Sequence, residues 1–360
     1  MKVAVVLGTR PEIIKMASVI RELEKTSTDY FILHTGQHYS YNLDKVFFEQ
    51  LNLPHAKYNL EVGSGSHAEQ TAKILIGTEK VLKEENPDIV LVEGDTNSVL
   101  AAALAAAKLH IKVGHIEAGL RSHDMQMPEE INRILTDHCS DYLFAPAEGA
   151  KATLMNEGIH EGKIFVTGNT IVDAVYQHLD MAKKSAKTLS TMGLRKGEYF
   201  LVTLHRQENV DNRERFASIL ESLDKIAAEY GLPVIYPVHP HSQKMMAEFA
   251  LKAKNLRLID PVAYLGFLQL ESNARLILTD SGGVQEEACI LKIPCVTLRD
   301  NTERPETIEI GSNMLAGASP KKILKCSKVM LSKQNGWINP YGDGRAGYRI
   351  VKQVLENKHG

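Results

Sequence analysis

Short apolar runs alternate with amphipathic stretches along the whole 360-residue chain. The runs are rich in valine, isoleucine and leucine, which is typical of strands buried on both faces of a parallel sheet. The predicted strands are Val3–Leu7, Phe31–Thr35, Asp88–Val92, Lys112–Ile116, Tyr142–Ala145, Ile164–Val166, Tyr199–Leu204, Val234–Val238, Leu256–Ile259, Arg275–Thr279 and Cys295–Leu298. The predicted helices are Pro11–Glu24, Ala68–Lys83, Ser98–Leu109, Glu129–Asp137, Arg213–Glu229 and Gln285–Leu291. This alternation predicts an α/β fold with parallel sheets that helices cover on both sides.

The length exceeds that of a usual single core, so we expect two domains. A polar, lysine-rich segment, Met181–Thr191, interrupts the pattern before a new strand begins. We therefore expect one Rossmann-like, doubly wound domain over 1–185 and a second over 186–340. Ligands of such sheets bind at the carboxyl ends of the strands, and two such domains imply a cleft between them.

Composition limits the kinds of partner and the location that we expect. The formal net charge of −2 gives no reason to expect a nucleic-acid or membrane partner. The four cysteines form no CxxC pair and no metal-ligand spacing, which favours reduced thiols and a cytoplasmic location. We expect neither a signal peptide nor a membrane span, because no run approaches the ~20 apolar residues that a span needs.

The most informative motif is Leu278–Ala288, in which an apolar run ends in Ser281-Gly282-Gly283 and becomes a helix with two adjacent carboxylates. Glycines here allow a ligand to approach the N–H groups at the helix start, as a pyrophosphate would. Glu286 or Glu287, one turn further on, could accept hydrogen bonds from a ribose diol. A simple tight turn is the alternative interpretation.

Carboxylates follow the predicted strands of the first half. Asp95 either reaches the site or caps the next helix. Glu117 lies among small residues with no helix to cap, and Glu129 begins a helix, where acidic residues also occur for dipole reasons. Arg10 either clamps a phosphate or forms a surface ion pair. The surrounding Gly8-Thr-Arg-Pro-Glu12 has neither a dinucleotide-binding nor a P-loop fingerprint.

The second half contributes His205, Arg206, Ser281, Gly282 and Arg304. Acid/base groups in one half and anion binders in the other suit a sugar whose leaving group is a phosphate. His239-Pro-His241 invites a zinc interpretation, but no third ligand lies at a recognisable spacing, which favours loop histidines and no metal. The polar loop Asp300–Glu306, which contains Arg304, could equally be a solvated turn.

Together these motifs resemble the non-hydrolysing UDP-N-acetylglucosamine 2-epimerases. The matching segments are Gly8-Thr-Arg-Pro-Glu12 with Lys15, Gly94-Asp-Thr96, Gly114–Arg121, Pro128–Arg133, Gly168-Asn-Thr170, His205-Arg206, Thr279–Ala288, Thr302–Glu306 and Asn339–Gly344. They occur in the family's order from Gly8 to the C-terminal helix. The resemblance implies a GT-B-type architecture, a homodimer, and a C-terminal helix, here 341–360, that returns to the first domain.

The resemblance also implies a reaction without a cofactor. UDP-N-acetylglucosamine and UDP-N-acetylmannosamine interconvert by elimination and re-addition of UDP through 2-acetamidoglucal, for cell-surface polysaccharide biosynthesis. Asp95, Glu117 and Glu129 would carry the acid/base steps, and His205 would assist the departure and return of UDP. The implied UDP-binding residues are Arg10, Lys15, Ser281, Gly282, Gly283, Glu287 and Arg304. Which carboxylate serves which face of the sugar stays open.

An allosteric site is implied at Gln37, His38 and Arg206, where UDP-N-acetylglucosamine activates members of the family. This chain departs from the pattern there. Tyr39 replaces an arginine that often follows Gln-His, and Gly65-Ser66 replaces an arginine–glutamine pair. We therefore expect weaker activation.

Three other functions stay open from the sequence: a hydrolysing epimerase that releases N-acetylmannosamine, a GT-B UDP-sugar glycosyltransferase, and a non-catalytic UDP-sugar sensor. The glycosyltransferase would need an acceptor site and not three carboxylates. The sensor would have no use for Asp95 and Glu117.

Overall fold

The computed structural model describes residues 1–37, 41–185 and 187–356, and it contains two compact units. Unit 1 comprises residues 1–174 with the segment from Tyr341 onward, and unit 2 comprises Val175–Pro340. The division falls inside helix α7 (Thr170–Ser185), earlier than the boundary expected from the lysine-rich segment. The reason is that the later part of α7 packs on unit 2, where the His178 ring lies 5.6 Å from that of Tyr264.

Unit 1 is built on a seven-stranded parallel sheet in the order β3-β2-β1-β4-β5-β6-β7. The strands are β1 (Lys2–Leu7), β2 (Asp29–His34), β3 (Tyr58–Asn59), β4 (Ile89–Glu93), β5 (Lys112–Ile116), β6 (Tyr142–Ala145) and β7 (Ile164–Val166). The helices besides α7 are α1 (Arg10–Lys25), α2 (Tyr41–Gln50), α3 (His67–Glu85), α4 (Asn97–Lys108), α5 (Pro128–Cys139), α6 (Glu148–Asn156) and α16 (Ala346–Glu356), and η1 (Glu161–Lys163) is a 3-10 turn.

Strand β1 shows why the apolar runs form this sheet. Its residues from Val3 to Leu7 are all buried, because helices cover both faces. The sheet grows from β1 to β2 on one side and to β4 on the other, so the loops after β1 and β4 diverge. Such a switch point opens a crevice at the carboxyl ends of the strands.

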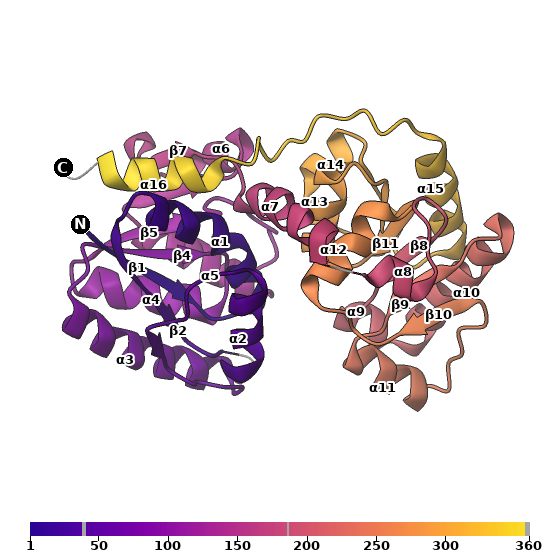
Figure 1. Ribbon diagram of the computed structural model, residues 1–360, viewed down its shortest axis with the longest axis horizontal. Coiled ribbons are helices and arrows are strands. Elements are labelled where there is room, and N and C mark those ends of the chain that lie inside the picture. Colours follow the sequence, from indigo (N-terminus) through magenta and orange to yellow (C-terminus); the bar gives the residue numbers. More distant parts are fainter. Residues whose placement is uncertain (38–40, 186, 357–360) are drawn as a thin grey trace. The chain divides into compact units, whose positions relative to one another are not determined.

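Helix α16 brings the C-terminal part of the chain onto unit 1, where it packs beside α1 (Figure 1). The Asp173 carboxylate caps this helix by accepting the N–H groups of Ala346 and Gly347, each at 3.0 Å. A side chain at Gly347 would lie within 2.8 Å of the backbone of Ser18, so the close approach of α16 to α1 requires glycine.

Unit 2 repeats the architecture with a six-stranded parallel sheet in the order β10-β9-β8-β11-β12-β13. The strands are β8 (Phe200–Thr203), β9 (Val234–Pro237), β10 (Leu256–Ile259), β11 (Leu276–Thr279), β12 (Cys295–Thr297) and β13 (Asn313–Leu315). The helices are α8 (Thr188–Met192), α9 (Gln207–Val210), α10 (Arg213–Tyr230), α11 (Pro240–Glu248), α12 (Tyr264–Asn273), α13 (Gly282–Ile290), α14 (Pro305–Glu309) and α15 (Pro320–Ser332). Its switch point lies between β8 and β11.

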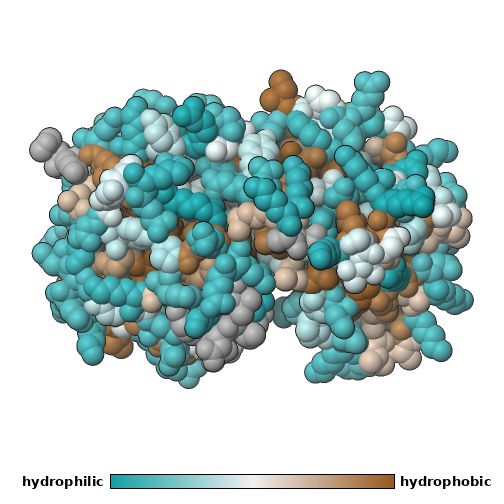
Figure 2. Space-filling view, viewed as in Figure 1, coloured by the Kyte–Doolittle hydropathy of each residue, from teal (hydrophilic) through white to brown (hydrophobic). Residues whose placement is uncertain are grey.

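The predicted α/β class with two doubly wound sheets is confirmed, and every predicted strand and helix is present with bounds shifted by a few residues. The sequence missed β3 and β13, which are edge strands of two and three residues. No helix in the described part of the chain combines the length and apolar composition needed to cross a bilayer. Hydrophilic side chains predominate on the face drawn in Figure 2, and hydrophobic ones form small groups there.

Candidate active site

Asp95 follows β4 and is held by two residues of α5. The guanidinium of Arg133 lies 2.5 Å from its carboxylate, and the amide of Asn132 donates to its carbonyl oxygen at 2.9 Å. The helix cap that sequence offered as the alternative is supplied by the next residue, because the Thr96 hydroxyl accepts the N–H of Val99. Asp95 therefore does not cap α4, and its carboxylate stays partly exposed beside Arg133.

Glu117 follows β5 directly and is almost fully buried. Its φ of 68° is in the left-handed region, which non-glycine residues rarely adopt and which occurs more often at functional sites. One carboxylate oxygen accepts both the Lys15 ammonium at 2.7 Å and the Asn169 amide at 2.9 Å. Lys15, predicted among the UDP-binding residues, is thus an ion-pair partner of Glu117 and also of Glu93, at 3.1 Å.

The adjacent glutamates of α5 have different surroundings. Glu130 is buried and accepts the N–H groups of Ser122 and His123, each at 2.9 Å, and the guanidinium of Arg133 at 2.8 Å. Burial raises the pKa of Glu130, but these partners together hold it below its ordinary value. Glu129 is partly exposed, and its side chain forms no hydrogen bond or ion pair within the described ranges. The carboxylate open to a ligand is therefore that of Glu129.

Other predicted residues of unit 1 divide between surface and interior. Arg10 begins α1, with its guanidinium 5.0 Å from the ring of Phe47. Gln37 is buried, and its side-chain oxygen accepts the N–H and the hydroxyl of Ser98 at 2.9 and 2.7 Å. Gln37 therefore joins the loop after β2 to α4. His38 lies outside the described residues.

Sequence reasoning missed a buried pair that supports the loop of Glu117. His115 lies 2.7 Å from Asp137 through Nδ1 and 2.8 Å from the Gly94 carbonyl oxygen through Nε2. Asp137 also accepts the guanidinium of Arg121 at 2.7 Å and the N–H of Gly119 at 3.2 Å. A strand histidine and a helix aspartate offer no periodic signal of their pairing, which depends on the tertiary fold.

The start of α13 has the space that a ligand would need. Ser281 caps the helix by accepting the N–H of Val284 at 3.5 Å. A side chain at Gly282 would come no closer than 3.6 Å to Glu303, and one at Gly283 no closer than 4.0 Å to Ser281. Neither glycine has a positive φ, so neither backbone conformation nor internal packing requires it. Open space therefore lies beside these N–H groups, as an anion site would need.

The two carboxylates of α13 are distinguished by their partners. Glu286 is fully buried and pairs with the Arg304 guanidinium at 2.7 Å. Glu287 accepts the hydroxyl of Tyr264 at 3.3 Å and adjoins the fully buried Glu271. Burial, reinforced by Glu287, raises the pKa of Glu271 well above its usual range. Burial therefore disfavours the charged form of Glu271, next to which Glu287 lies.

Asp280 organises the loop that carries His205. The buried Asp280 carboxylate accepts the N–H groups of His205 and Arg206 at 3.1 and 3.0 Å and the amide of Asn209 at 3.1 Å. It also lies 3.3 Å from the His205 ring. Desolvation lowers the pKa of His205 against the opposing effect of Asp280, which favours a neutral ring near neutral pH. Arg206, the residue before α9, is half-buried.

The two loop histidines considered as zinc ligands have other partners. His239 caps α11 by accepting the N–H of His241 at 3.2 Å, and His241 lies 2.5 Å from Asp211. Within the ranges that the structure describes, no group of three His, Cys, Asp or Glu residues could hold a metal ion.

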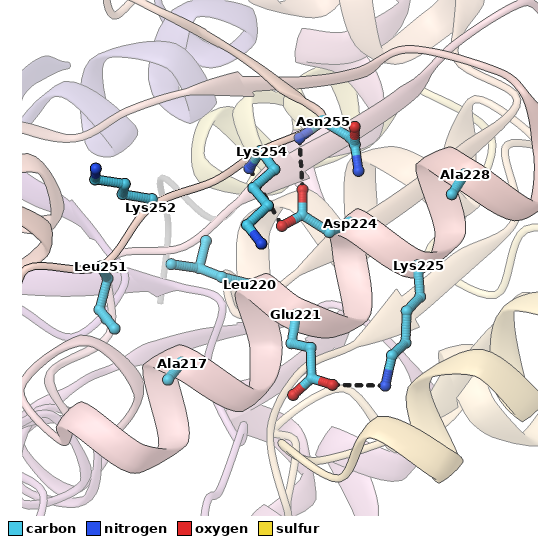
Figure 3. Close-up of a pocket in the computed structure, with 10 residues that line it drawn as sticks. All are labelled: Ala217, Leu220, Glu221, Asp224, Lys225, Ala228, Leu251, Lys252, Lys254 and Asn255. Atoms are coloured by element: carbon cyan, nitrogen blue, oxygen red, sulfur yellow. Dashed lines mark hydrogen bonds and ion pairs between the residues drawn. The ribbon is translucent and has the colours of Figure 1, made fainter.

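A pocket of about 410 Å³ in unit 2 contains none of the predicted residues (Figure 3). It lies between α10 and the segment from Leu251 to Asn255. Its two acidic side chains contact neighbouring residues, since Glu221 lies 2.6 Å from Lys225 and Asp224 accepts the N–H of Asn255 at 2.7 Å. The pocket therefore offers no chemistry comparable to that of the strand ends.

The chain is similar to known proteins over nearly its whole length. The model of the family described as UDP-N-acetylglucosamine 2-epimerase matches residues 21–355. A relative from Methanocaldococcus jannaschii, named UDP-N-acetylglucosamine 2-epimerase, is 57% identical with 100% of each chain covered. A Pseudomonas aeruginosa relative named UDP-2,3-diacetamido-2,3-dideoxy-D-glucuronate 2-epimerase is 43% identical, with 99% of this chain and 100% of the relative covered. A crystal structure of the M. jannaschii enzyme in complex with UDP-GlcNAc and UDP is similar with a TM-score of 0.92 at 57% identity, covering 99% of this chain and 100% of that one.

Proposed function

This chain belongs to the UDP-N-acetylglucosamine 2-epimerase family, and we propose that it interconverts UDP-N-acetylglucosamine and UDP-N-acetylmannosamine without releasing free sugar. The observation that carries this proposal is the placement of three carboxylates in unit 1. Asp95 follows β4, Glu117 follows β5, and Glu129 lies in the first turn of α5. A protein that only binds UDP-sugars, or transfers the sugar to an acceptor, has no need of this set.

The chemistry explains why several carboxylates are needed. The C2–H bond of the bound sugar has no adjacent carbonyl, so its proton leaves only together with UDP. A carboxylate takes the proton from C2, the C1–O bond breaks with its electron pair going to UDP, and C1 and C2 become doubly bonded. UDP then adds back to C1 while an acid delivers a proton to the other face of C2. Asp95, Glu117 and Glu129 carry these proton transfers in our proposal.

Unit 2 would hold the nucleotide. The N–H groups at the start of α13, from Gly282 onward, would bind the diphosphate, and Glu287 would accept the ribose hydroxyls. A neutral His205 can donate a hydrogen bond to the diphosphate as negative charge develops on it. Arg10, the first residue of α1, is a second group that we propose for the diphosphate, with its positive charge offsetting the negative charge of the phosphates. The ion pair of Arg304 with Glu286 favours a supporting role for Arg304 beside the diphosphate.

Regulation and assembly are further parts of the proposal. Ser66, which belongs to the Gly65-Ser66 pair that departs from the family pattern, caps α3 in a capping box with Glu69. Its structural use, with the buried position of Gln37, supports weaker activation by UDP-N-acetylglucosamine than in relatives.

A homodimer would cover the apolar side chains that α3 and α5 expose, namely Ile76, Ile131 and Leu135. Light scattering on the purified protein tests this assembly.

The test of the reaction is a proton NMR time course with UDP-N-acetylglucosamine and no other addition. We expect a second anomeric signal of UDP-N-acetylmannosamine and no free sugar. Free N-acetylmannosamine with UDP would support a hydrolysing enzyme instead. If the enzyme does not act on this substrate but epimerises UDP-2,3-diacetamido-2,3-dideoxy-D-glucuronate, for which the P. aeruginosa relative is named, that compound is the substrate instead.

A further inference from the structure

Glu93 is a buried carboxyl that the proposed reaction does not use. It is the last residue of β4 and is 1% exposed. Its Oε1 lies 3.1 Å from the ammonium of Lys15, but that ammonium makes its shorter contact with Glu117, at 2.7 Å. Two carboxyls from neighbouring strand ends therefore share one cation.

The charges do not balance if both carboxyls are ionised. Two carboxylates beside one ammonium leave a net negative charge in a largely buried site, and this is costly. Glu12, a third buried carboxyl, adds to the repulsion that Glu93 experiences. A proton on one of the carboxyls removes the imbalance.

Hydrogen bonding distinguishes the two carboxyls. Glu117 accepts two directed hydrogen bonds, from Lys15 and from Asn169, which stabilise its charged form. The Oε1 atom of Glu93 receives no directed hydrogen bond from any donor in the described part of the chain. Burial raises the pKa of Glu93 well above its usual range, Lys15 opposes this, and Glu117 and Glu12 reinforce it.

We propose that Glu93 is a neutral positioning residue, whose buried carboxyl donates a hydrogen bond to Glu117 and so fixes the one carboxylate that Lys15 neutralises. Glu117, whose backbone is already held at a φ of 68°, is thereby kept ionised and in one orientation. This inference rests on the proposed role of Glu117 in proton transfer. Glu93 itself contacts no reacting atom.

Two substitutions distinguish a neutral donor from a charge. Glutamine keeps the shape of Glu93 and the ability to donate, so Glu93→Gln should retain kcat and its pH profile within about twofold. Methionine fills similar space but cannot donate, so Glu93→Met should lower kcat by on the order of tenfold with KM little changed. Equal losses in both variants, failure of Glu93→Gln to fold, or an unchanged kcat in Glu93→Met would each overturn the proposal.

An infrared measurement without substrate separates this inference from the proposed reaction. The difference spectrum of the wild type minus Glu93→Gln, recorded at pH 8, should contain the carbonyl band of a protonated carboxyl. Glu248→Gln, which changes an exposed glutamate, provides the reference for the loss of an ionised carboxylate. A carboxylate band in the Glu93 difference spectrum would overturn the inference whatever reaction the enzyme catalyses.

Discussion

The carboxylate of Asp95 lies 2.5 Å from the guanidinium of Arg133, which also binds the buried carboxylate of Glu130 at 2.8 Å. One guanidinium thus links a candidate proton carrier in the loop after β4 to a structural carboxylate on α5. Arginine can make both contacts because its donors are arranged in a planar fork.

Replacing Arg133 by lysine should therefore impair catalysis more than binding. Lysine keeps the charge but cannot hold both carboxylates in the same geometry, so we expect Arg133→Lys to lower kcat by on the order of tenfold with little change in KM. Steady-state kinetics on protein with a verified melting temperature checks this. A wild-type kcat in the folded variant would show that Arg133 does not position Asp95.

The neighbouring glutamates of α5 should respond oppositely to the same substitution. We expect Glu129→Gln to lower turnover by on the order of 100-fold with unchanged stability, because the side chain has no internal partner in the described ranges. Glu130→Gln should instead cost on the order of 3 kcal/mol of stability, because a buried ion pair with Arg133 is broken. Kinetics and chemical denaturation of both variants test the assignment, which reversed effects would contradict.

Glu12 should make stability depend on pH. Burial raises its pKa from 4.5 to about 7, against the hydrogen bonds from Thr96 and Gly8. The folded state therefore binds more protons than the unfolded chain between these values, and stability falls as the pH rises through this window. Its contribution is on the order of 3 kcal/mol. Denaturation at pH 5 and pH 8 should show a smaller decline in Glu12→Gln than in the wild type; equal declines would show that Glu12 does not titrate in this range.

The contribution of the ribose contact to UDP affinity can be measured with a modified nucleotide. Wild-type protein should bind UDP more tightly than 2′-deoxy-UDP by on the order of tenfold, because one hydroxyl that Glu287 accepts is missing. In Glu287→Ala, UDP should bind more weakly, and the preference over the deoxy form should disappear. Calorimetry measures all four affinities. If the preference survives in Glu287→Ala, the ribose does not bind at this carboxylate.

The positions of the candidate residues could be predicted because they follow apolar strands. The strands ending at Leu7, Glu93, Ile116 and Thr279 are buried apart from the lysines that begin two of them, and parallel strands bring their carboxyl ends to one edge of each sheet. The edge strands β3 and β13 could not be predicted, since two or three residues carry too little pattern.

The partners of these residues could not be read from the sequence. Lys15 meets Glu93 and Glu117 because β4 pairs with both β1 and β5, and strand order is a property of the tertiary structure. Likewise, periodicity does not distinguish Glu129 from Glu130, because only the loop that contains Ser122 and His123 decides which of them is buried.

Incorporation of solvent deuterium tests the central claim most directly. Wild-type protein is incubated with UDP-N-acetylglucosamine in deuterium oxide, in parallel with Glu117→Gln, and the recovered UDP-sugars are analysed by NMR and mass spectrometry. Proton removal at C2 predicts one deuterium at C2 in the recovered UDP-sugars of both configurations, and Glu117→Gln should incorporate on the order of 100-fold less. An epimerised product that keeps its original hydrogen at C2 would contradict the account.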